Sequence, residues 1–346
     1  MTQNSKRRVI LTGMGDFFPE TVLDNAFFDE LDIGSSTEWI NERVGIRERR
    51  SVLTQEDILR LRYGKITRQE LVESGKIMTI AAMVESPWKQ ALERANAGGR
   101  QVKIDTAICG TSVPDWDIPA NACSIAGRLG LDVAAFDVNS ACSTFAVNLH
   151  VARSLLLGGT SKAVGIFNAE RYTTRMDYSD RSACVLFGDS ASAAVLEAHD
   201  ATSGYEPKGL ELLDTIVHSD PSGYEHVRLP EGGNFSQNGK AVQKFAVTKT
   251  VHVTLEILAK NGLDKADISY FIGHQANFRM LDYACKMNGI GPERHLFNVD
   301  VRGNQGATGA PTVLSTHWDK YKRGDIIVVA VVGSGLTWGA ALFRKL

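Results

Sequence analysis

Residues 135–149, AFDVNSACSTFAVNL, carry the strongest local signal in the sequence. A short run of strand-forming residues, 135–138, leads into a turn of small residues, and apolar residues then recur at steps of three and four from Cys142 to Leu156. This pattern predicts a strand, a tight turn and a largely buried helix with Cys142 in its first turn. At that position free backbone N–H groups and the positive end of the helix dipole would stabilise a thiolate, the nucleophilic form of cysteine.

Strand and helix patterns alternate from this stretch toward both ends of the chain. Such alternation is typical of an α/β fold. We expect strands at 8–11, 106–109, 135–138, 162–167, 191–196, 268–272, 295–299 and 326–332, and helices of the second half at 241–260 and 279–287. The sequence therefore predicts two α/β halves, 1–200 and 201–346, with a connection in the small and polar segment 201–208.

One region departs from this alternation. Residues 52–97 carry two charged, leucine-containing helix patterns, EDILRLRYGKI and TRQELVESGKIMTIAAMVESPWKQALERA. They predict a helical insertion, which is either a solvated helical hairpin packed on the sheet or a lid that shapes substrate access. The sequence leaves both possibilities open.

Composition argues against several classes of protein. The 346 residues include 43% hydrophobic residues and carry a net charge of −2, which disfavours disorder and the binding of duplex DNA. Five widely spaced cysteines without a Cys-x-x-Cys pair disfavour a zinc site and a disulfide framework. No apolar run approaches the roughly 20 residues of a membrane helix, so we expect a protein of the reducing cytoplasm without metal, nucleic acid or membrane partners.

Two common motifs are incomplete or missing. Gly13-Met14-Gly15 follows the first strand, but Phe18 stands where the dinucleotide motif G-x-G-x-x-G has its third glycine. The serine-hydrolase motif G-x-S-x-G does not occur in the sequence. We therefore expect neither a Rossmann cofactor site nor an esterase.

Two more strand-to-helix junctions carry polar residues. His274 lies in GHQAN at 273–277, and Asn304 lies in GNQGATG at 303–309. Each alone could be a capped histidine or a plain turn. Together with Cys142 they place a nucleophile, an imidazole and a carboxamide at the sheet edge where open α/β folds hold ligands. We expect these three side chains to share one site.

Six stretches carry a family resemblance in a fixed order along nearly the whole chain. They are SSTEWINERVGIRER at 35–49, DVNSACSTF at 137–145, DRSACVLFGDSASAAVL at 180–196, GHQANFRM at 273–280, RGNQGATGA at 302–310 and GSGLTWGAAL at 333–342. Together they resemble the β-ketoacyl-acyl-carrier-protein synthase III family. The resemblance implies the thiolase fold, a five-layered αβαβα architecture built from two duplicated halves, and a homodimer.

The same resemblance implies the reaction and its residues. The implied activity is a decarboxylative Claisen condensation of a Cys-bound acyl group with a malonyl or β-ketoacyl thioester, in fatty-acid initiation or a specialised, polyketide-like pathway. Cys142 would accept the acyl group, and His274 and Asn304 would bind the malonyl thioester carbonyl. Two preorganised donors lower the barrier to the enolate that forms on loss of CO2. The backbone N–H groups of Cys142 and Ser334 are the implied oxyanion hole.

The resemblance also marks residues that bind the thioester carriers. Acyl-CoA and acyl carrier protein are the implied substrates and partners, and no cofactor is implied. The residues implied for coenzyme A are Trp39 and Arg181, which would stack on its nucleotide, Arg43 near a phosphate, and Asn277 along the pantetheine tunnel. The basic patch implied for acyl carrier protein comprises Lys244, Arg279 and Lys286, each of which could equally be a solvated surface charge.

Three positions depart from the family's pattern. The usual Gly-Asn-Thr-Ser is Gly-Asn-Gln-Gly at 303–306, Ser334 stands in the glycine-rich oxyanion loop, and Val332 replaces a bulky aromatic residue. With the segment 52–97, longer than in housekeeping members, these changes indicate an acyl pocket or entrance reshaped for a longer or unusual chain.

Two other functions stay open. One is an acyltransferase that moves the acyl group from Cys142 to an oxygen or nitrogen nucleophile, although family members of that kind often lose the asparagine that is kept here as Asn304. The other is a non-catalytic partner subunit of a condensing-enzyme heterodimer. A scaffold has no need for the three polar residues, so condensation is the leading hypothesis.

Overall fold

Nine strands form one mixed sheet in the computed structural model, which describes residues 7–200 and 207–346. Their order across the sheet is β11-β12-β13-β8-β1-β7-β6-β4-β5. The pairs β4–β5, β4–β6 and β11–β12 are parallel, and the other neighbours are antiparallel. The strands are β1 (Arg7–Phe17), β4 (Thr106–Gly110), β5 (Ala134–Asp137), β6 (Ala163–Glu170), β7 (Ser190–Asp200), β8 (Leu210–Ser219), β11 (Ile268–Gly273), β12 (Ile326–Gly333) and β13 (Thr337–Lys345).

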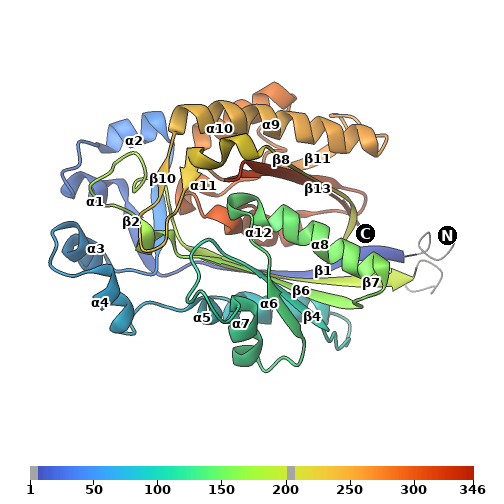
Figure 1. The fold of residues 1–346 in the computed structure, drawn as a ribbon. Helices are drawn as coiled ribbons and strands as arrows, with labels where there is room; N and C mark the ends of the chain where they lie inside the picture. The colour runs from blue at the N-terminus through green and yellow to red at the C-terminus, as the bar shows by residue number, and fades with distance from the viewer. Residues whose placement is uncertain (1–6, 201–206) are drawn as a thin grey trace.

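Helices cover and separate the two halves of this sheet, so that five layers are stacked in Figure 1. From one outer face to the other they are α9 and α10, then β8, β13, β12 and β11, then α8 and α12, then β1, β7, β6 and β4, and last α5, α6 and α7. The helices of these layers are α5 (Ile80–Met83), α6 (Glu85–Ala95), α7 (Asn121–Leu129), α8 (Thr144–Gly158), α9 (Gly239–Lys260), α10 (Phe278–Asn288) and α12 (Gly309–Thr316).

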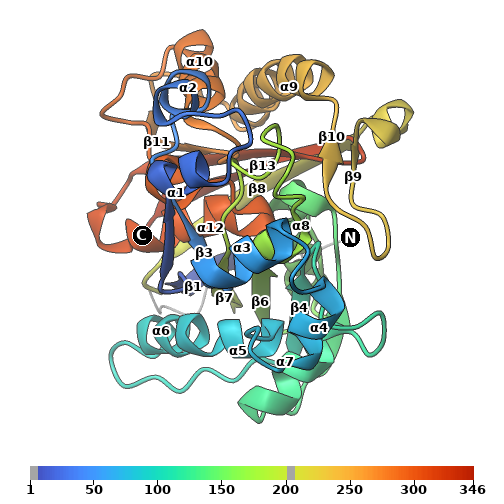
Figure 2. The same ribbon diagram turned by 90° about the vertical axis from the view of Figure 1, so that its left-hand side faces the viewer.

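Smaller elements complete the described chain. Figure 2 shows α1 to α4 together at one end of the layers. The smaller helices are α1 (Asn25–Glu30), α2 (Thr37–Arg43), α3 (Gln55–Arg62), α4 (Arg68–Glu73) and α11 (Val299–Arg302). Two two-stranded ribbons complete the set: β2 (Thr21–Asp24) with β3 (Glu48–Ser51), and β9 (Val227–Arg228) with β10 (Ser236–Gln237).

The central helix α8 explains why the apolar pattern after Cys142 is so broad. It packs against strands of both halves of the sheet, including β6 and β8. A helix enclosed in this way must be apolar on most of its surface. Phe145, Leu149 and Leu156 of α8 are therefore fully buried, in one cluster with Ile166 of β6 and Val329 of β12.

The two glycines of the incomplete dinucleotide motif serve helix packing. A Cβ atom at Gly13 would collide with the carbonyl oxygen of Ala91, and one at Gly15 would collide with that of Pro87. Both carbonyls belong to α6, which lies directly on β1. Glycine is therefore needed on β1 because helix and strand backbones approach closely there.

The predicted insertion 52–97 is helical, and its two parts lie in different places. α3 and α4 bury Ile58 and Leu71 at the end of the molecule seen in Figure 2. α5 and α6 instead form part of an outer layer of the fold, where Ile80, Trp88 and Ala91 are buried against the sheet. A role of this segment in substrate access stays a prediction.

One predicted strand is wrong. Residues 295–299 form only a single bridge, between His295 and Phe271, and the chain then enters α11. The side-chain oxygen of Gln275 accepts hydrogen bonds from the backbone N–H groups of Asn298 (3.1 Å) and Val299 (3.2 Å). These bonds cap the start of α11 and take the place of a strand ladder. The other predicted strands are confirmed. The strands β8 and β13 were not predicted.

The sheet divides at the pair β1–β8. Strands from residues 7–200 lie on one side of this pair and strands from residues 210–345 on the other, joined by the register Ile10↔Glu211 and Leu11↔Leu210. Most of the predicted connection 201–208 falls outside the described residues. The division into halves at residue 200 therefore stays a prediction.

Candidate active site

A strained turn after β5 presents Cys142. Asn139 accepts a hydrogen bond from the backbone N–H of Ala141 (2.9 Å), and the backbone N–H of Ser140 donates to the Thr144 hydroxyl (2.8 Å). Ala141 has a φ angle of 46°, a conformation that costs non-glycine residues energy and is found mainly at functional sites. Cys142 lies in the 3₁₀ turn Ala141–Ser143, and α8 begins only at Thr144. Cys142 therefore lies one short turn before the α-helix and not, as predicted, in the first turn of that helix.

The sulfur of Cys142 is a thiol in this environment. Burial raises its pKa to about 12, and the negative charge of Glu170 acts in the same direction, whereas the nearby Tyr172 hydroxyl acts against the rise. The expected thiolate is therefore wrong for the resting protein, because desolvation outweighs the stabilisation offered by the backbone. Acyl transfer to Cys142 requires a group that accepts its proton.

His274 follows β11 and is held as a neutral imidazole. Only 8% of the residue is exposed, and burial lowers its pKa to about 4. A neutral ring carries one N–H and can donate a hydrogen bond from it. The neighbouring Gln275, fully buried, fixes the loop by donating to the carbonyl of Gly273 (2.8 Å) while it caps α11.

Asn304 is locked by its backbone and by one side-chain bond. Its N–H donates to the carbonyl of Leu186 (2.8 Å), and its carbonyl accepts from Gly188 (3.0 Å). Its side-chain oxygen accepts from the backbone N–H of Gly306 (3.0 Å). Because the oxygen is occupied, the amide nitrogen is the end left to act as a donor.

Gln305 supports the loop that carries Asn304, at the position where the family's pattern has a threonine. It is fully buried, and its oxygen accepts from the hydroxyls of Ser190 (2.9 Å) and Thr312 (3.0 Å). Its nitrogen donates to the side chain of Asn298 (2.8 Å). This long side chain therefore ties the loop to β7, α12 and the start of α11.

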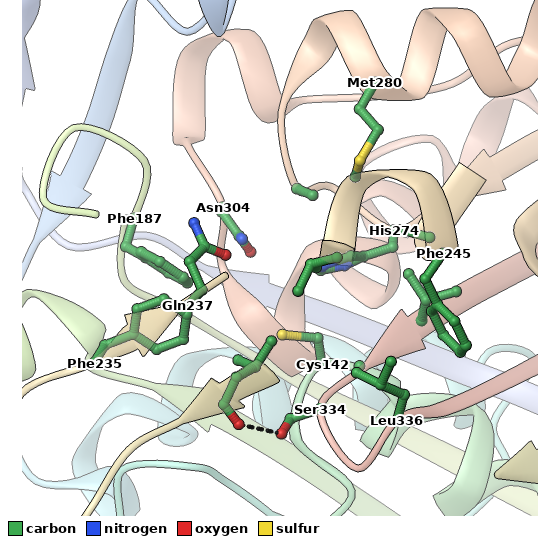
Figure 3. A pocket seen from close by; sticks show the side chains of 16 residues that line it. Cys142, Phe187, Phe235, Gln237, Phe245, His274, Met280, Asn304, Ser334 and Leu336 are labelled. Atoms are coloured by element: carbon green, nitrogen blue, oxygen red, sulfur yellow. Dashed lines mark hydrogen bonds between the residues drawn. The ribbon is translucent and has the colours of Figure 1, made fainter. Parts of the chain in front are cut away.

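Cys142, His274 and Asn304 surround one cavity. Figure 3 shows the three side chains grouped around it, although they come from three separate loops. The apolar part of its wall includes Val227, Phe235, Val242, Phe245, Met280 and Leu336. The predicted convergence of the three polar residues thus holds in the structure.

Ser334 and Val332 also line the cavity. The Ser334 hydroxyl donates to the carbonyl of Val227 (2.7 Å), the bond drawn in Figure 3, and so fixes the loop after β12. A Cβ at the preceding Gly333 would lie 3.0 Å from the backbone nitrogen of Cys142. The two loops expected to form an oxyanion hole therefore meet. None of residues 52–97 is part of the lining.

The structure brings together only part of the expected coenzyme A residues. The guanidinium of Arg181 lies 4.9 Å from the ring centre of Trp39 and donates to the carbonyl of Gly34, so a base could stack between the two only after they separate. Arg43 is exposed at the end of α2. Asn277 caps α10 by accepting from the N–H of Met280 (2.8 Å) and does not line the cavity.

The three expected carrier-protein residues lie on α9 and α10. Arg279 donates to backbone carbonyls of α2, including that of Asn41 (2.9 Å), and Lys286 pairs with Asp282 (2.7 Å). Lys244 is exposed and borders a groove that also includes Tyr283 and Met287. The surface therefore combines cations with exposed apolar groups.

Sequence reasoning missed several residues of this site. Gln237 of β10 lines the cavity as a further carboxamide, and Figure 3 shows it on the side of Asn304. Glu170 and Tyr172 lie close enough to Cys142 to influence its pKa. The only local signal for Glu170 was a carboxylate three residues beyond the predicted strand 162–167. Nothing local marks Gln237, because its strand has two residues.

The sequence matches the models of one protein family. Residues 136–221 match the family model described as 3-oxoacyl-[acyl-carrier-protein] synthase III, and residues 258–345 match the model of its C-terminal part. The chain is 32% identical over 346 residues to the β-ketoacyl-[acyl-carrier-protein] synthase III of Coxiella burnetii, covering 96% of this chain and 98% of that protein. It belongs to the β-ketoacyl-acyl-carrier-protein synthase III family.

Solved structures of synthase III proteins share this fold. The crystal structure of 3-oxoacyl-[acyl-carrier-protein] synthase III from Aquifex aeolicus has a TM-score of 0.83 and 31% identity, and the match covers 97% of this chain and all of that one. The priming β-ketosynthase of a polyketide biosynthetic pathway has a TM-score of 0.80 and 26% identity, with 100% and 98% covered. The fold is therefore the thiolase fold, and the protein is a condensing acyltransferase of the synthase III type.

Across the part of the chain that the structure describes, every helix is too short or too polar to span a bilayer. In the same residues, no group of three or more His, Cys, Asp or Glu side chains is arranged to hold a metal ion.

Proposed function

We propose that this enzyme transfers an acyl group from a thioester to Cys142 and condenses it with a malonyl or β-ketoacyl thioester, with loss of CO2 from the malonyl group. The observation that carries the proposal is the placement of one thiol, one neutral imidazole and one amide donor around a single cavity. Acyl-CoA and acyl-carrier-protein thioesters are the substrates, and no cofactor takes part.

His274 and Asn304 act on the extender thioester. Loss of CO2 leaves an enolate, and its oxygen needs donors that are already in place. His274 supplies an N–H because burial keeps the ring neutral, and Asn304 supplies its amide because Gly306 occupies the oxygen. Both residues are more than nine-tenths buried, so water competes little for the enolate.

The enolate then attacks the thioester on Cys142. The tetrahedral oxyanion that forms is held by the backbone N–H groups of Cys142 and Ser334. The close approach of Gly333 to the nitrogen of Cys142 supports this assignment, because it brings the two loops together. Removing one donor of such a pair typically slows the reaction about 10²- to 10³-fold.

The apolar wall of the cavity receives the acyl chain. Val332, where the family has a bulky aromatic residue, enlarges the space beside His274, which favours a longer or branched acyl group. The pathway is fatty-acid initiation or a specialised, polyketide-like route. The structural likeness to the priming β-ketosynthase of a polyketide pathway supports the polyketide-like route as well as fatty-acid initiation.

Coenzyme A and the acyl carrier protein approach from the side of α2 and α10. Trp39 and Arg181 offer flat faces to the adenine, Arg43 a cation for its phosphate, and Asn277 a carboxamide beside the pantetheine. The exposed cations recruit the acidic carrier protein and raise the encounter rate. They are Lys244, Arg279 and Lys286.

The test is intact mass spectrometry after incubation with a panel of acyl-CoA and acyl-carrier thioesters. The wild type should gain one acyl group, and Cys142→Ala should gain none. Cys142→Ala is a small change at a partly buried site, so a thermal unfolding curve close to that of the wild type serves as its folding control. An acyl group retained in full on Cys142→Ala would exclude the proposed nucleophile.

His274→Ala and Asn304→Ala separate condensation from acylation. Both variants should still be acylated on Cys142, but they should release CO2 from a malonyl thioester at least about 10²-fold more slowly. Transfer of the acyl group to an alcohol or amine without CO2 release would identify the acyltransferase alternative. Absence of any adduct on the wild type would favour a non-catalytic partner subunit.

We further propose that the protein is a cytoplasmic homodimer. Each chain consists of two duplicated halves, 1–200 and 201–346. The edge strand β5 is largely exposed. Large apolar side chains are also exposed on β5, at Phe136, and in the preceding segment, at Trp116 and Ile118. An edge strand with such neighbours favours pairing with a second copy. The five free cysteines suit a reducing compartment. Sedimentation equilibrium should give twice the chain mass.

A further inference from the structure

One polar side chain of the active-site cavity has no role in the proposed function so far. The residues of the lining with polar side chains are Cys142, His274, Asn304, Ser334 and Gln237. The first three carry out the chemistry, and the Ser334 hydroxyl donates to the carbonyl of Val227 (2.7 Å). Across residues 7–200 and 207–346, the carboxamide of Gln237 has no hydrogen-bond partner. Its N–H donors and its oxygen are therefore free for a ligand.

The ribbon of β9 and β10 fixes the place of Gln237 in the cavity wall. The backbone of Gln237 pairs with that of Val227, which is tied to the loop after β12 by the Ser334 hydroxyl. Phe235, two residues earlier, lies on the same face of the chain, because side chains of an extended segment alternate. Phe235 is buried, and its ring centre lies 4.6 Å from that of Phe187. These contacts hold the residue at one position beside the reacting groups.

Gln237 lies on the side of the cavity opposite Met280 of α10. Figure 3 shows it on the same side as Phe187 and Phe235, whereas Met280 and Phe245 lie on the other sides of Cys142. In the proposed function the thioester carriers approach over α2 and α10, so their pantetheine arm enters along the wall that contains Met280. Gln237 therefore faces the acyl group and not the amides of the carrier arm.

A carboxamide without a protein partner in an apolar cavity restricts which acyl groups bind well. The wall near it is apolar and includes Val227, Phe235 and Val242. An acyl chain that fills the cavity removes water from the carboxamide. A pure hydrocarbon chain offers no hydrogen bond in exchange, and an unsatisfied buried donor or acceptor weakens binding. A chain with an oxygen at that place replaces the lost water and is preferred.

The carboxylate of a malonyl extender is a poor partner for Gln237. This carboxylate leaves as neutral CO2, and its negative charge moves to the thioester carbonyl during the reaction. A donor to the carboxylate would stabilise the bound extender more than the transition state and would slow decarboxylation. A neutral keto or hydroxyl oxygen on the acyl group has no such disadvantage. The amide N–H can donate to either oxygen, and the amide oxygen can accept from a hydroxyl.

We propose that Gln237 selects acyl groups that carry a keto or hydroxyl oxygen on the chain. The inference rests on the proposed function, in which Cys142 is acylated and the apolar wall receives the chain. Gln237 determines specificity and takes no part in bond making: its amide N–H donates to the chain oxygen while the sulfur of Cys142 holds the thioester. The preferred substrate is a partly oxidised acyl group. Such a group arises from a condensation that is not followed by complete reduction of the keto group.

The experiment is a competition between two acyl-CoA thioesters of equal chain length and equal concentration, one unsubstituted and one with a keto or hydroxyl group at carbon 3 or carbon 5. Intact mass spectrometry at low conversion gives the ratio of the two adducts, which equals the ratio of their kcat/KM values for acylation. The wild type should favour at least one oxygenated thioester by about tenfold or more. Gln237→Met, of similar length but without an amide, should lower this preference to about twofold or less. Gln101→Met, at an exposed glutamine after α6, should keep the wild-type ratio.

The ratio of adducts separates substrate selection from a structural role. A partial loss of folded protein does not change this ratio, because both thioesters compete for the same folded molecules. If Gln237→Met slowed the reaction of all thioesters equally and kept the wild-type ratio, the residue would be structural or would bind the common carrier arm, and the proposal would be overturned. The same holds if the wild type takes the unsubstituted thioester as readily as every oxygenated one. A wild type that gains no adduct from any thioester would instead refute the proposed function itself.

Discussion

At the scale of single residues, the orientation of the Asn304 amide depends on buried side chains outside the cavity. Gln305 anchors the loop to Ser190, Thr312 and Asn298, and Gly306 holds the Asn304 oxygen. The departure from the family's Thr-Ser is therefore a different way of holding the same amide. The energy of this arrangement comes from satisfied buried polar groups, which cost about 1–3 kcal/mol each when a partner is removed.

Replacing Gln305 tests this support. Gln305→Leu has similar size but leaves the Asn298 oxygen without its donor and deprives the hydroxyls of Ser190 and Thr312 of one partner each, so the free energy of unfolding should fall by about 1–3 kcal/mol. A small displacement of Asn304 should slow malonyl decarboxylation by about 10²-fold, while acylation of Cys142 stays close to normal. Urea unfolding and CO2 release measure the two effects, with the exposed Gln243→Leu as control. Unchanged decarboxylation would show that Asn304 is positioned without Gln305.

At the scale of elements, the close contact of α6 with β1 fixes how one outer layer sits on the sheet. The carbonyls of Ala91 and Pro87 reach the strand only because Gly13 and Gly15 lack side chains. The contact lies on the far side of β1 from α8, so the same strand is packed by helices on both faces. This geometry explains a glycine pair that the sequence alone relates to a nucleotide site.

Gly13→Ala should destabilise the protein without touching the active site. The added methyl group meets a backbone carbonyl that cannot rotate away, so α6 must shift, at a cost of about 1–3 kcal/mol. Gly127→Ala in α7 is the matched control, because nothing lies within 4 Å of its Cβ position, and it should stabilise the helix by about 0.5–1 kcal/mol. Chemical denaturation measures both. Equal stability of Gly13→Ala and the wild type would contradict the close packing.

At the scale of the whole molecule, burial of ionisable groups decides how stability depends on pH. Burial lowers the pKa values of His274 and His295 to about 4, below the 6.5 of a free imidazole. The unfolded chain therefore binds protons between about pH 6.5 and 4 that the folded protein does not bind. Stability falls as the pH drops through this range. Glu170 has the opposite effect, since its raised pKa favours folding at low pH and this stability is lost between about pH 4.5 and 8.

The acid-sensitive range can be assigned with one variant. His295 is buried, its Nε2 atom has no hydrogen-bond partner in the described structure, and its ring lies 4.9 Å from that of Phe297. His295→Phe should therefore reduce the loss of stability between pH 7.5 and pH 5 by about 2 kcal/mol, because one proton-binding site of the unfolded chain is removed. Urea unfolding at the two pH values measures this. An unchanged loss in the variant would show that His295 is protonated in the folded protein.

Short-range patterns were enough for the framework of the fold and for the main residues of the site. Strand and helix periods located β4, β6, β7, β11, β12, α9 and α10 to within a few residues. Cys142, His274 and Asn304 were found because each follows a strand, and the ends of such strands meet at one edge. Alternation of elements also implied the layered α/β architecture. These features depend on neighbours in sequence, so the sequence displays them directly.

Long-range packing decided everything that depends on desolvation or on contact between distant segments. The helix pattern at Cys142 indicated a thiolate, but burial and Glu170 make it a thiol. The apolar run at 295–299 indicated a strand, but Gln275 starts a helix there. Glu170, Tyr172 and Gly306 are 136 positions apart at most, and only the fold brings them together. Free energies of burial and partner choice are set by the three-dimensional surroundings, which no local period of the sequence records.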